Sequence, residues 1–184
     1  MKSTMRLGMV VMGLLAIAGL WVPAGVMAAD TIKIGVIYPL TGGAAAEGRE
    51  LRAGAELAME IVNKVYPNIS MNMAKNEGIK SLKGAKIELI FKDHEGNPTV
   101  GADLAKKLIL DDKVVGILGC YHSAVTKTVS AVCEQYGIPM INDSSTSPEL
   151  TKRGFKWFWR TTPHDVKEGR YKPPETLLAF LQSL

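Results

Sequence analysis

Hydrophobic positions along this chain follow two alternating spacings. Short runs rich in Val and Ile and closed by Gly or Pro are typical of strands, whereas apolar residues three and four positions apart are typical of helices. These patterns predict strands over residues 31–38, 86–92, 114–118, 139–142 and 156–161. They predict helices from the glycine-rich turn after residue 39 to about residue 64, over 98–110 and over 123–136, with a brief helix after 147.

Single residues sharpen several of these predictions. Asn97 followed by Pro98 predicts a capped helix start, and Gly137 predicts the end of the third helix. The run over 114–118 has no polar interruption, so we expect a strand that is covered on both faces. Residues 65–84 have no clear period and are expected to form a surface excursion between the first helix and the second strand.

The order of strands and helices predicts an α/β fold, a doubly wound parallel sheet with helices on both faces. Residues 30–165 are expected to form one lobe of this kind. Residues 166–184 carry a weaker pattern, with a helix predicted over 175–184. Because no strand follows that helix, we expect the lobe to be part of a larger architecture.

Residues 1–28 have the organisation of a secretory signal peptide. Lys2 and Arg6 precede an apolar run over 7–20, and small residues close the stretch before Ala29. A transmembrane anchor is the alternative, but the apolar run is interrupted by glycines and is shorter than a span of about 20 residues. No cysteine lies at the cleavage site for lipid attachment. We therefore expect export, cleavage and a mature protein free in an exported compartment.

Composition and charge exclude further classes of protein. The 184 residues are 47% hydrophobic and 22% charged, as in an ordinary globular domain. The formal charge of +4 includes two basic residues of the leader, and basic residues do not cluster with aromatics, so no nucleic-acid partner is expected. Cys120 and Cys133 are expected to lie about 15 Å apart along a helix. That distance is too long for a disulfide, so both thiols are predicted to be free and mostly buried.

Small hydroxyl side chains gather after the third and the fourth predicted strand. The first loop contains Tyr121, His122 and Ser123, and the second contains Ser144, Ser145, Thr146 and Ser147. Parallel strands end at the same edge of a sheet, so both loops should face one crevice. Hydroxyls and the N–H groups of a helix start suit a small anion such as an amino-acid carboxylate. For Ser123 or Ser147 alone, helix capping is the alternative interpretation.

Other chemistry lacks its sequence signals. The glycine loop over 42–48 does not have the G-x-G-x-x-G spacing, and no phosphate-binding P-loop occurs. Ser123 beside His122 suggests a hydrolase, but the flanking glycines of a nucleophile elbow are missing. His94, His122 and His164 are scattered, which favours packed or solvent-facing imidazoles over metal ligands. We predict no enzyme activity, no catalytic residue, no cofactor and no metal.

Six segments of the chain resemble a known family, in order: IKIGVIYPLTG, GADLAKKLI, VVGILG, GIPMIN, SSTSPELTKRG and FWRTTPHD. They are similar to periplasmic solute-binding proteins of the leucine/isoleucine/valine-binding type, from Ile32 to Asp165. The resemblance implies two type I α/β lobes joined by a hinge, with the ligand held between them. It also implies a monomer that delivers a branched-chain or other amino acid, or an amide, to an ABC permease in the inner membrane.

The resemblance assigns roles to the two hydroxyl loops. Ser123 matches the serine whose hydroxyl binds the ligand carboxylate. Ser144, Ser145 and Thr146 match the small-residue stretch after the fourth strand. There the carbonyl of Ser144 would accept from the ligand ammonium, and Thr146 would contribute its hydroxyl and its N–H.

Three further residues fall where the family lines the pocket for the ligand side chain. Tyr121 and His122 are two of them, and the third is Glu47 in the first loop. The family often has an aromatic residue at that last position. Glu47 departs from this pattern, which argues against a specificity for purely aliphatic ligand side chains.

Family members continue into a second lobe and then return to complete the first. Residues 166–184 diverge from the family pattern, so we expect them to begin the crossover to a second lobe that is missing from this chain. The expected function is that of an exported, truncated solute-binding protein with half a cleft. A ligand-sensing domain of the same fold that acts in signalling is the alternative.

Overall fold

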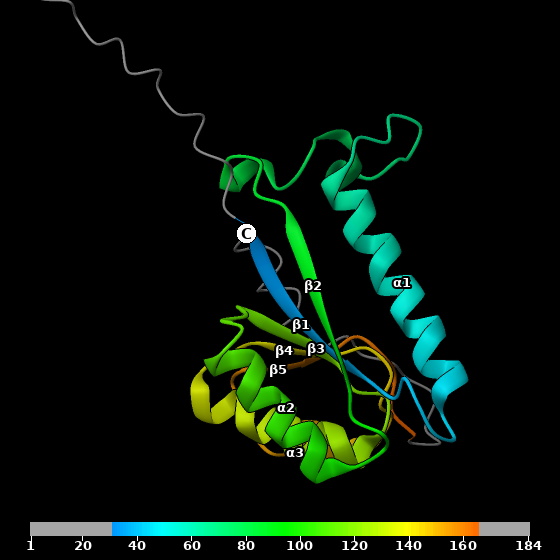
Figure 1. Ribbon diagram of the computed structural model, residues 1–184, viewed down its shortest axis with the longest axis vertical. Helices are drawn as coiled ribbons and strands as arrows, with labels where there is room; N and C mark the ends of the chain where they lie inside the picture. The colour runs from blue at the N-terminus through cyan, green and yellow to red at the C-terminus, as the bar shows by residue number, and fades with distance from the viewer. Residues whose placement is uncertain (1–30, 166–184) are drawn as a thin grey trace, which may run out of the picture.

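Five parallel strands form one sheet at the centre of the protein (Figure 1). The structure is a computed structural model that describes residues 31–165. The strands are β1 (Ile32–Tyr38), β2 (Ile87–Asp93), β3 (Gly116–Gly119), β4 (Met140–Asn142) and β5 (Phe158–Arg160). Their order in the sheet is β2-β1-β3-β4-β5, and every neighbouring pair is parallel. The predicted α/β fold with a doubly wound parallel sheet is confirmed.

Three helices connect the strands and lie on the two faces of the sheet. α1 (Ala45–Asn63) joins β1 to β2 on one face, whereas α2 (Pro98–Leu110) and α3 (Ser123–Tyr136) lie side by side on the other (Figure 1). β1 has β2 on one side and β3 on the other, so the direction of winding reverses between β1 and β3. In sheets of this kind, ligands bind outside the carboxyl ends of the strands near that reversal.

The bounds of α2 and α3 agree with the residues that signalled them. Asn97 Oδ1 accepts hydrogen bonds from two N–H groups of the first turn of α2, at 2.8 and 3.3 Å. Gly137 ends α3 with a φ of 66°, and its N–H closes the last turn. An L-residue with a side chain rarely adopts that φ, which is why glycine is the usual residue after a helix.

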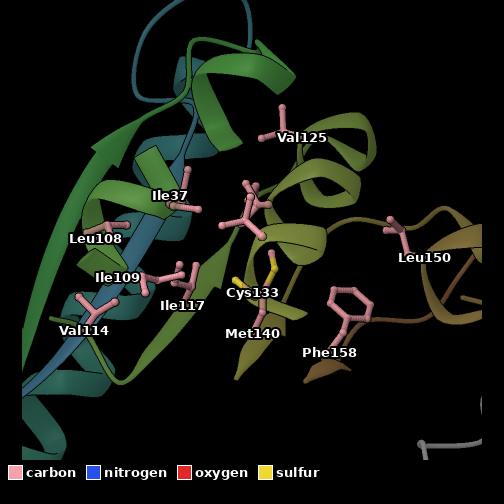
Figure 2. Packing of buried hydrophobic residues seen from close by; sticks show 14 residues of the cluster. Ile37, Leu108, Ile109, Val114, Ile117, Val125, Cys133, Met140, Leu150 and Phe158 are labelled. Atoms are coloured by element: carbon pink, nitrogen blue, oxygen red, sulfur yellow. The ribbon is translucent and has the colours of Figure 1, made fainter. Parts of the chain in front are cut away.

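The hydrophobic core lies between the sheet and the α2–α3 pair (Figure 2). Leu108 and Val129 from the helices and Ile117 and Met140 from the strands are among its fully or almost fully buried members. Both cysteines also lie in this core, and both are free, as predicted. Burial raises the pKa of Cys133 to about 12, so its thiol stays protonated and unreactive at neutral pH.

The other face of the sheet is open beside α1. Along β3, burial alternates, and Val115 just before the strand is 55% exposed. The prediction that this segment is covered on both faces is therefore wrong. The physical reason is that α1 packs against β1 and β2, so its apolar stripe does not reach far enough to close the middle of the sheet. Within α1 only Gly48 and Val62 are buried.

Residues 64–86 form the predicted excursion, which includes two short 3-10 helices, η1 (Asn72–Lys75) and η2 (Lys80–Leu82). Within residues 31–165, no helix combines the length and the apolar character that crossing a membrane requires. The predicted signal peptide over 1–28 and the predicted helix over 175–184 lie outside the described residues.

Alanine substitutions at two glycines of α1 are expected to have opposite effects on stability, because only one of these glycines lies against the end of β1. A Cβ at Gly48 would lie 1.9 Å from the carbonyl oxygen of Pro39, whereas Gly54 faces open space. We expect Gly48→Ala to lower the free energy of unfolding by about 1–3 kcal/mol, because the helix must move away. We expect Gly54→Ala to raise it by up to about 1 kcal/mol, because alanine favours helix. Urea unfolding followed by circular dichroism measures both, and equal effects would contradict the close approach.

Candidate functional site

The loops after β3 and β4 meet at the carboxyl edge of the sheet, as the parallel order predicts. The N–H of Ser147 donates to Ser123 Oγ at 3.3 Å, and the hydroxyl of Ser145 donates to the Tyr121 carbonyl at 2.9 Å. These contacts join residues that are 24 positions apart in the sequence. The structure therefore brings together both groups of hydroxyls that the sequence singled out.

A buried relay of hydrogen bonds holds the two loops in place. The N–H of Cys120 donates to Thr126 Oγ1 at 3.3 Å, and Thr126 Oγ1 lies 2.5 Å from Ser145 Oγ. Because the single proton of Ser145 Oγ goes to the Tyr121 carbonyl, Thr126 is the donor in that contact. Thr126 and Ser145 are both almost completely buried. The hydroxyl of Ser145 thus positions the loops from inside the protein.

Asn142 at the end of β4 fixes the turn of the second loop. Its Oδ1 accepts from the Ser145 N–H at 2.9 Å, and its Nδ2 donates to the Ser145 carbonyl at 2.7 Å. Asn142 is completely buried, so both groups of its amide find partners where water cannot reach them. The backbone of Ser145 is thereby held against this amide.

Ser123 and Ser147 do not act as helix caps here. The cap position of α3 is His122, which makes no side-chain capping bond, and Ser123 is the first helical residue. Ser147 occupies the cap position of the 3-10 helix η3 (Pro148–Thr151) and also makes no such bond. Ser123 Oγ accepts from Ser147, which leaves its own hydroxyl proton as a donor. The first N–H groups of α3 lie beside it and favour an anion.

Thr146 and Ser144 lie on the same loop and each donates to a carboxylate. The hydroxyl of Thr146 donates to Asp165 Oδ2 at 2.7 Å, and the N–H of Asp165 donates back to the Thr146 carbonyl at 3.0 Å. The hydroxyl of Ser144 donates to Asp143 Oδ1 at 2.7 Å. Both hydroxyls are therefore placed and oriented to serve a carboxylate oxygen.

Asp143 is a residue of this edge that the sequence did not single out. Its second carboxylate oxygen accepts a hydrogen bond from the hydroxyl of Tyr38 at the end of β1. Tyr38 is 1% exposed, and its burial, followed by the charge of Asp143, raises the pKa of the phenol. Tyr38 therefore remains a neutral donor. The only available signal was an acidic residue directly after an apolar strand, and its partner lies 105 positions away.

Arg160, at the end of β5, is a second residue that the sequence did not single out. It is 3% exposed, and its Nη2 donates to the Ser147 carbonyl at 2.5 Å. Its Nε and Nη1 are buried and have no hydrogen-bond partner. Burial lowers the pKa of this guanidinium, but arginine remains charged at neutral pH. The site thus has a buried positive charge next to the loop that carries Thr146.

His94 and His122, expected to be scattered, are neighbours. Their ring centroids lie 5.3 Å apart in an edge-to-face arrangement, and the Tyr121 ring lies 5.1 Å from that of His122. Tyr121 has a φ of 72°, a left-handed conformation that costs roughly 1–3 kcal/mol for a residue with a side chain. The relay to the Tyr121 carbonyl holds this conformation in place.

Glu47 lies on the β1 side of the edge, exposed in the first turn of α1. The loop before it is tied to β2 through Asp93, which accepts from the Leu40 N–H at 2.9 Å and from the Thr41 hydroxyl at 2.6 Å. Burial on its own would raise the pKa of Asp93, and these hydrogen bonds outweigh it, so the pKa is lowered. Asp93 is therefore ionised at neutral pH and anchors the loop.

The polar groups of this edge do not form a metal site. No set of three or more His, Cys, Asp or Glu side chains among residues 31–165 is grouped so that it could hold a metal ion. What the edge does offer is hydroxyl donors, helix N–H groups and one buried guanidinium. Groups of these kinds are suited to holding an anionic group by hydrogen bonding and charge.

Comparisons with known proteins define the class of this lobe. Residues 31–170 match the family described as periplasmic binding protein. The chain belongs to this family, among the type I members that resemble the leucine/isoleucine/valine-binding proteins. The resemblance noted in the sequence is thereby confirmed.

Three relatives illustrate the similarity. Leu/Ile/Val-binding protein homolog 3 of Brucella melitensis is 34% identical over 75% of this chain and 33% of its own length. The leucine-, isoleucine-, valine-, threonine- and alanine-binding protein of Pseudomonas aeruginosa is 34% identical over 91% of this chain and 40% of its own. The crystal structure of a leucine-binding protein from Thermotoga maritima aligns with a TM-score of 0.60 and 29% identity, over 73% of this chain and 33% of its own. The chain thus spans about a third to two fifths of these relatives.

Because His94 is buried as a neutral ring, we expect the folded protein to lose stability in acid. Its Nδ1 accepts from the Gly96 N–H at 2.9 Å and its Nε2 contacts the Cys120 carbonyl at 2.8 Å, an arrangement that requires a neutral ring. Burial lowers its pKa below the ordinary 6.5, so the unfolded chain binds a proton first. The stability that His94 contributes is present above pH 6.5 and is lost as the pH falls towards the lowered value.

Thermal unfolding between pH 7.5 and pH 5 measures this loss. We expect His94→Gln to unfold at a lower Tm than the wild type at pH 7.5 but to lose less Tm on acidification. The exposed His164 offers a matched control, and His164→Gln should keep the pH dependence of the wild type. An identical pH dependence in His94→Gln and the wild type would contradict the assignment to His94.

Proposed function

We propose that this chain is the amino-terminal, ligand-capturing lobe of an exported solute-binding protein that serves an ABC importer for branched-chain or other amino acids or for amides. The observation that carries the proposal is the meeting of two hydroxyl loops at the start of α3. The names of the relatives, which state binding of leucine, isoleucine, valine and other amino acids, support the class of ligand. The predicted signal peptide supports the periplasm as the compartment.

The ligand carboxylate would bind between Ser123 and Thr146. Ser123 has a hydroxyl proton to donate, and the N–H groups of the first turn of α3 add a favourable field. The hydroxyl of Thr146 already donates to the exposed carboxylate of Asp165, so a ligand carboxylate would replace an existing partner of the same chemistry. The buried charge of Arg160, which reaches this loop through the Ser147 carbonyl, favours an anion in the same place.

The rest of the ligand would contact the remaining predicted residues. The carbonyl of Ser144 would accept from the ammonium group, while Tyr121 and His122 would border the side chain. Glu47, which is exposed on the β1 side of the edge, would lie at the far rim. This lobe on its own would cover the ligand on one side, so we expect it to bind more weakly than a closed two-lobe cleft does.

Substitution of the two carboxylate-binding hydroxyls tests the proposal. Hydrogen bonds to a charged group contribute about 1.5–3 kcal/mol, so Ser123→Ala and Thr146→Ala should each weaken binding roughly ten- to hundredfold. Titration of leucine, isoleucine, valine and their amides into the isotope-labelled chain, followed by NMR chemical shifts, measures dissociation constants up to the millimolar range. The amides should bind less tightly than the free acids if the carboxylate is what Ser123 and Thr146 hold.

Ser81, an exposed hydroxyl on η2 outside the site, offers a matched control. Ser81→Ala should bind as the wild type does. Unchanged affinity in both site variants would remove Ser123 and Thr146 from the site. A folded wild-type chain that shows no shift with any amino acid or amide would contradict the binding function itself.

A further inference from the structure

Asp143 carries a negative charge at the carboxyl edge that no ion pair within residues 31–165 neutralises. The residue directly follows β4, and it is half-buried. Its two carboxylate oxygens accept hydrogen bonds from the hydroxyls of Tyr38 and Ser144. The ion pairs of the described residues all involve other acids. Because a carboxylate that is partly removed from water is normally paired with a cation, this charge is available to a ligand.

Two neutral hydroxyls hold this carboxylate in one orientation. Tyr38 lies at the end of β1 and Asp143 follows β4, so their contact crosses the end of β3. Tyr38 is buried, and the raised pKa of its phenol keeps it a donor. The hydroxyl of Ser144 donates to the other oxygen, Oδ1, at 2.7 Å. Neutral donors of this kind orient the carboxylate and leave its charge in place.

The carboxylate lies next to the place assigned to the ligand ammonium group. Under the proposed function, on which this inference rests, the carbonyl of Ser144 accepts from that ammonium group. The hydroxyl of the same residue is bonded to Asp143. A carboxylate offers about four acceptor sites, whereas an ammonium group offers three N–H donors. The ammonium group can therefore use the Ser144 carbonyl and a free acceptor site of Asp143 together.

Asp165, the other carboxylate of this edge, is less suited to that role. It is exposed, and its carboxylate is bonded to Thr146, a hydroxyl assigned to the ligand carboxylate. Its charge also acts on a cation of the lobe, because it opposes the lowering of the Arg160 pKa by burial. Asp143 is therefore the acid whose position and charge both fit an ammonium group.

We propose that Asp143, positioned by Tyr38, binds the α-ammonium group of the ligand and restricts the site to ligands that carry one. A carboxylic acid without an amino group would bring a second negative charge towards Asp143 and would gain nothing in return. The lobe would thus select amino acids over simple carboxylic acids with its own residues.

A comparison of leucine with 4-methylpentanoate, which is leucine without its ammonium group, tests the proposal. NMR titration of the isotope-labelled chain measures both affinities. We expect the wild type to bind leucine at least roughly tenfold more tightly, as one charge-assisted hydrogen bond would give. Asp143→Asn keeps the size of the side chain and an acceptor for Tyr38. It should weaken leucine roughly tenfold and leave 4-methylpentanoate unchanged or slightly tighter, because a like charge is removed.

Two further variants separate the charge from its position and from the net charge of the chain. Tyr38→Phe removes the hydroxyl that orients Asp143 but keeps the carboxylate, so the preference for leucine should fall by a smaller factor than in Asp143→Asn. Asp103→Asn removes an exposed acid of α2, far from this edge in the sequence, and offers a matched control. It should bind both ligands as the wild type does.

The outcomes distinguish this inference from the proposed function. Loss of affinity by the same factor for both ligands in Asp143→Asn would give Asp143 a structural role only and overturn the inference. Equal affinity of the wild type for the two ligands would overturn it without the use of any variant. Either result leaves the proposed function standing. A folded wild-type chain that binds neither ligand would overturn both, and the dispersion of the NMR spectrum shows whether each protein is folded.

Discussion

The candidate site depends on a chain of three hydrogen bonds that is hidden beneath it. The chain runs from the Cys120 N–H through the hydroxyls of Thr126 and Ser145 to the Tyr121 carbonyl. Each hydroxyl accepts one bond and donates the next, so the bonds polarise one another and all point the same way. The chain joins α3 to the ends of β3 and β4, and it holds Tyr121 in a left-handed conformation. It therefore fixes the two hydroxyl loops relative to each other, together with the Ser147–Ser123 contact.

Local signals in the sequence predict the fold well, and they predict the site in part. Asn97 and Gly137 define helix ends because a cap depends on residues within one turn. The meeting of the two loops follows from the parallel order of the strands. The Tyr38–Asp143 contact and the His94–His122 pair could not be predicted. Each joins the ends of two strands that have a third strand between them, so each depends on the strand order of the whole sheet. The prediction that β3 is covered on both faces was wrong for a related reason. An apolar run in the sequence does not show whether a helix reaches the second face of the strand.

The two faces of the sheet differ in what completes them. On one face, α2 and α3 pack against each other and against the strands, and they enclose the core with residues close in sequence to the strands that they cover. On the other face, α1 lies over β1 and β2 and leaves apolar residues of β3 uncovered. The sheet therefore has one face that is closed by its own connections. On its second face, apolar side chains of the strands line a groove beside α1.

Under the proposed function, the charges at the carboxyl edge would suit a zwitterion better than a simple anion. Arg160 is buried beside the Ser147 carbonyl, and the start of α3 adds partial positive charge next to Ser123. Two carboxylates lie at the same loop. Asp143 accepts a hydrogen bond from the Ser144 hydroxyl, and Asp165 accepts one from the Thr146 hydroxyl. A bare anion would meet repulsion from these acids. Under the proposed function, an amino acid would place its carboxylate at the donors while its ammonium group lies nearer the acids, so both signs of charge at the edge would be used.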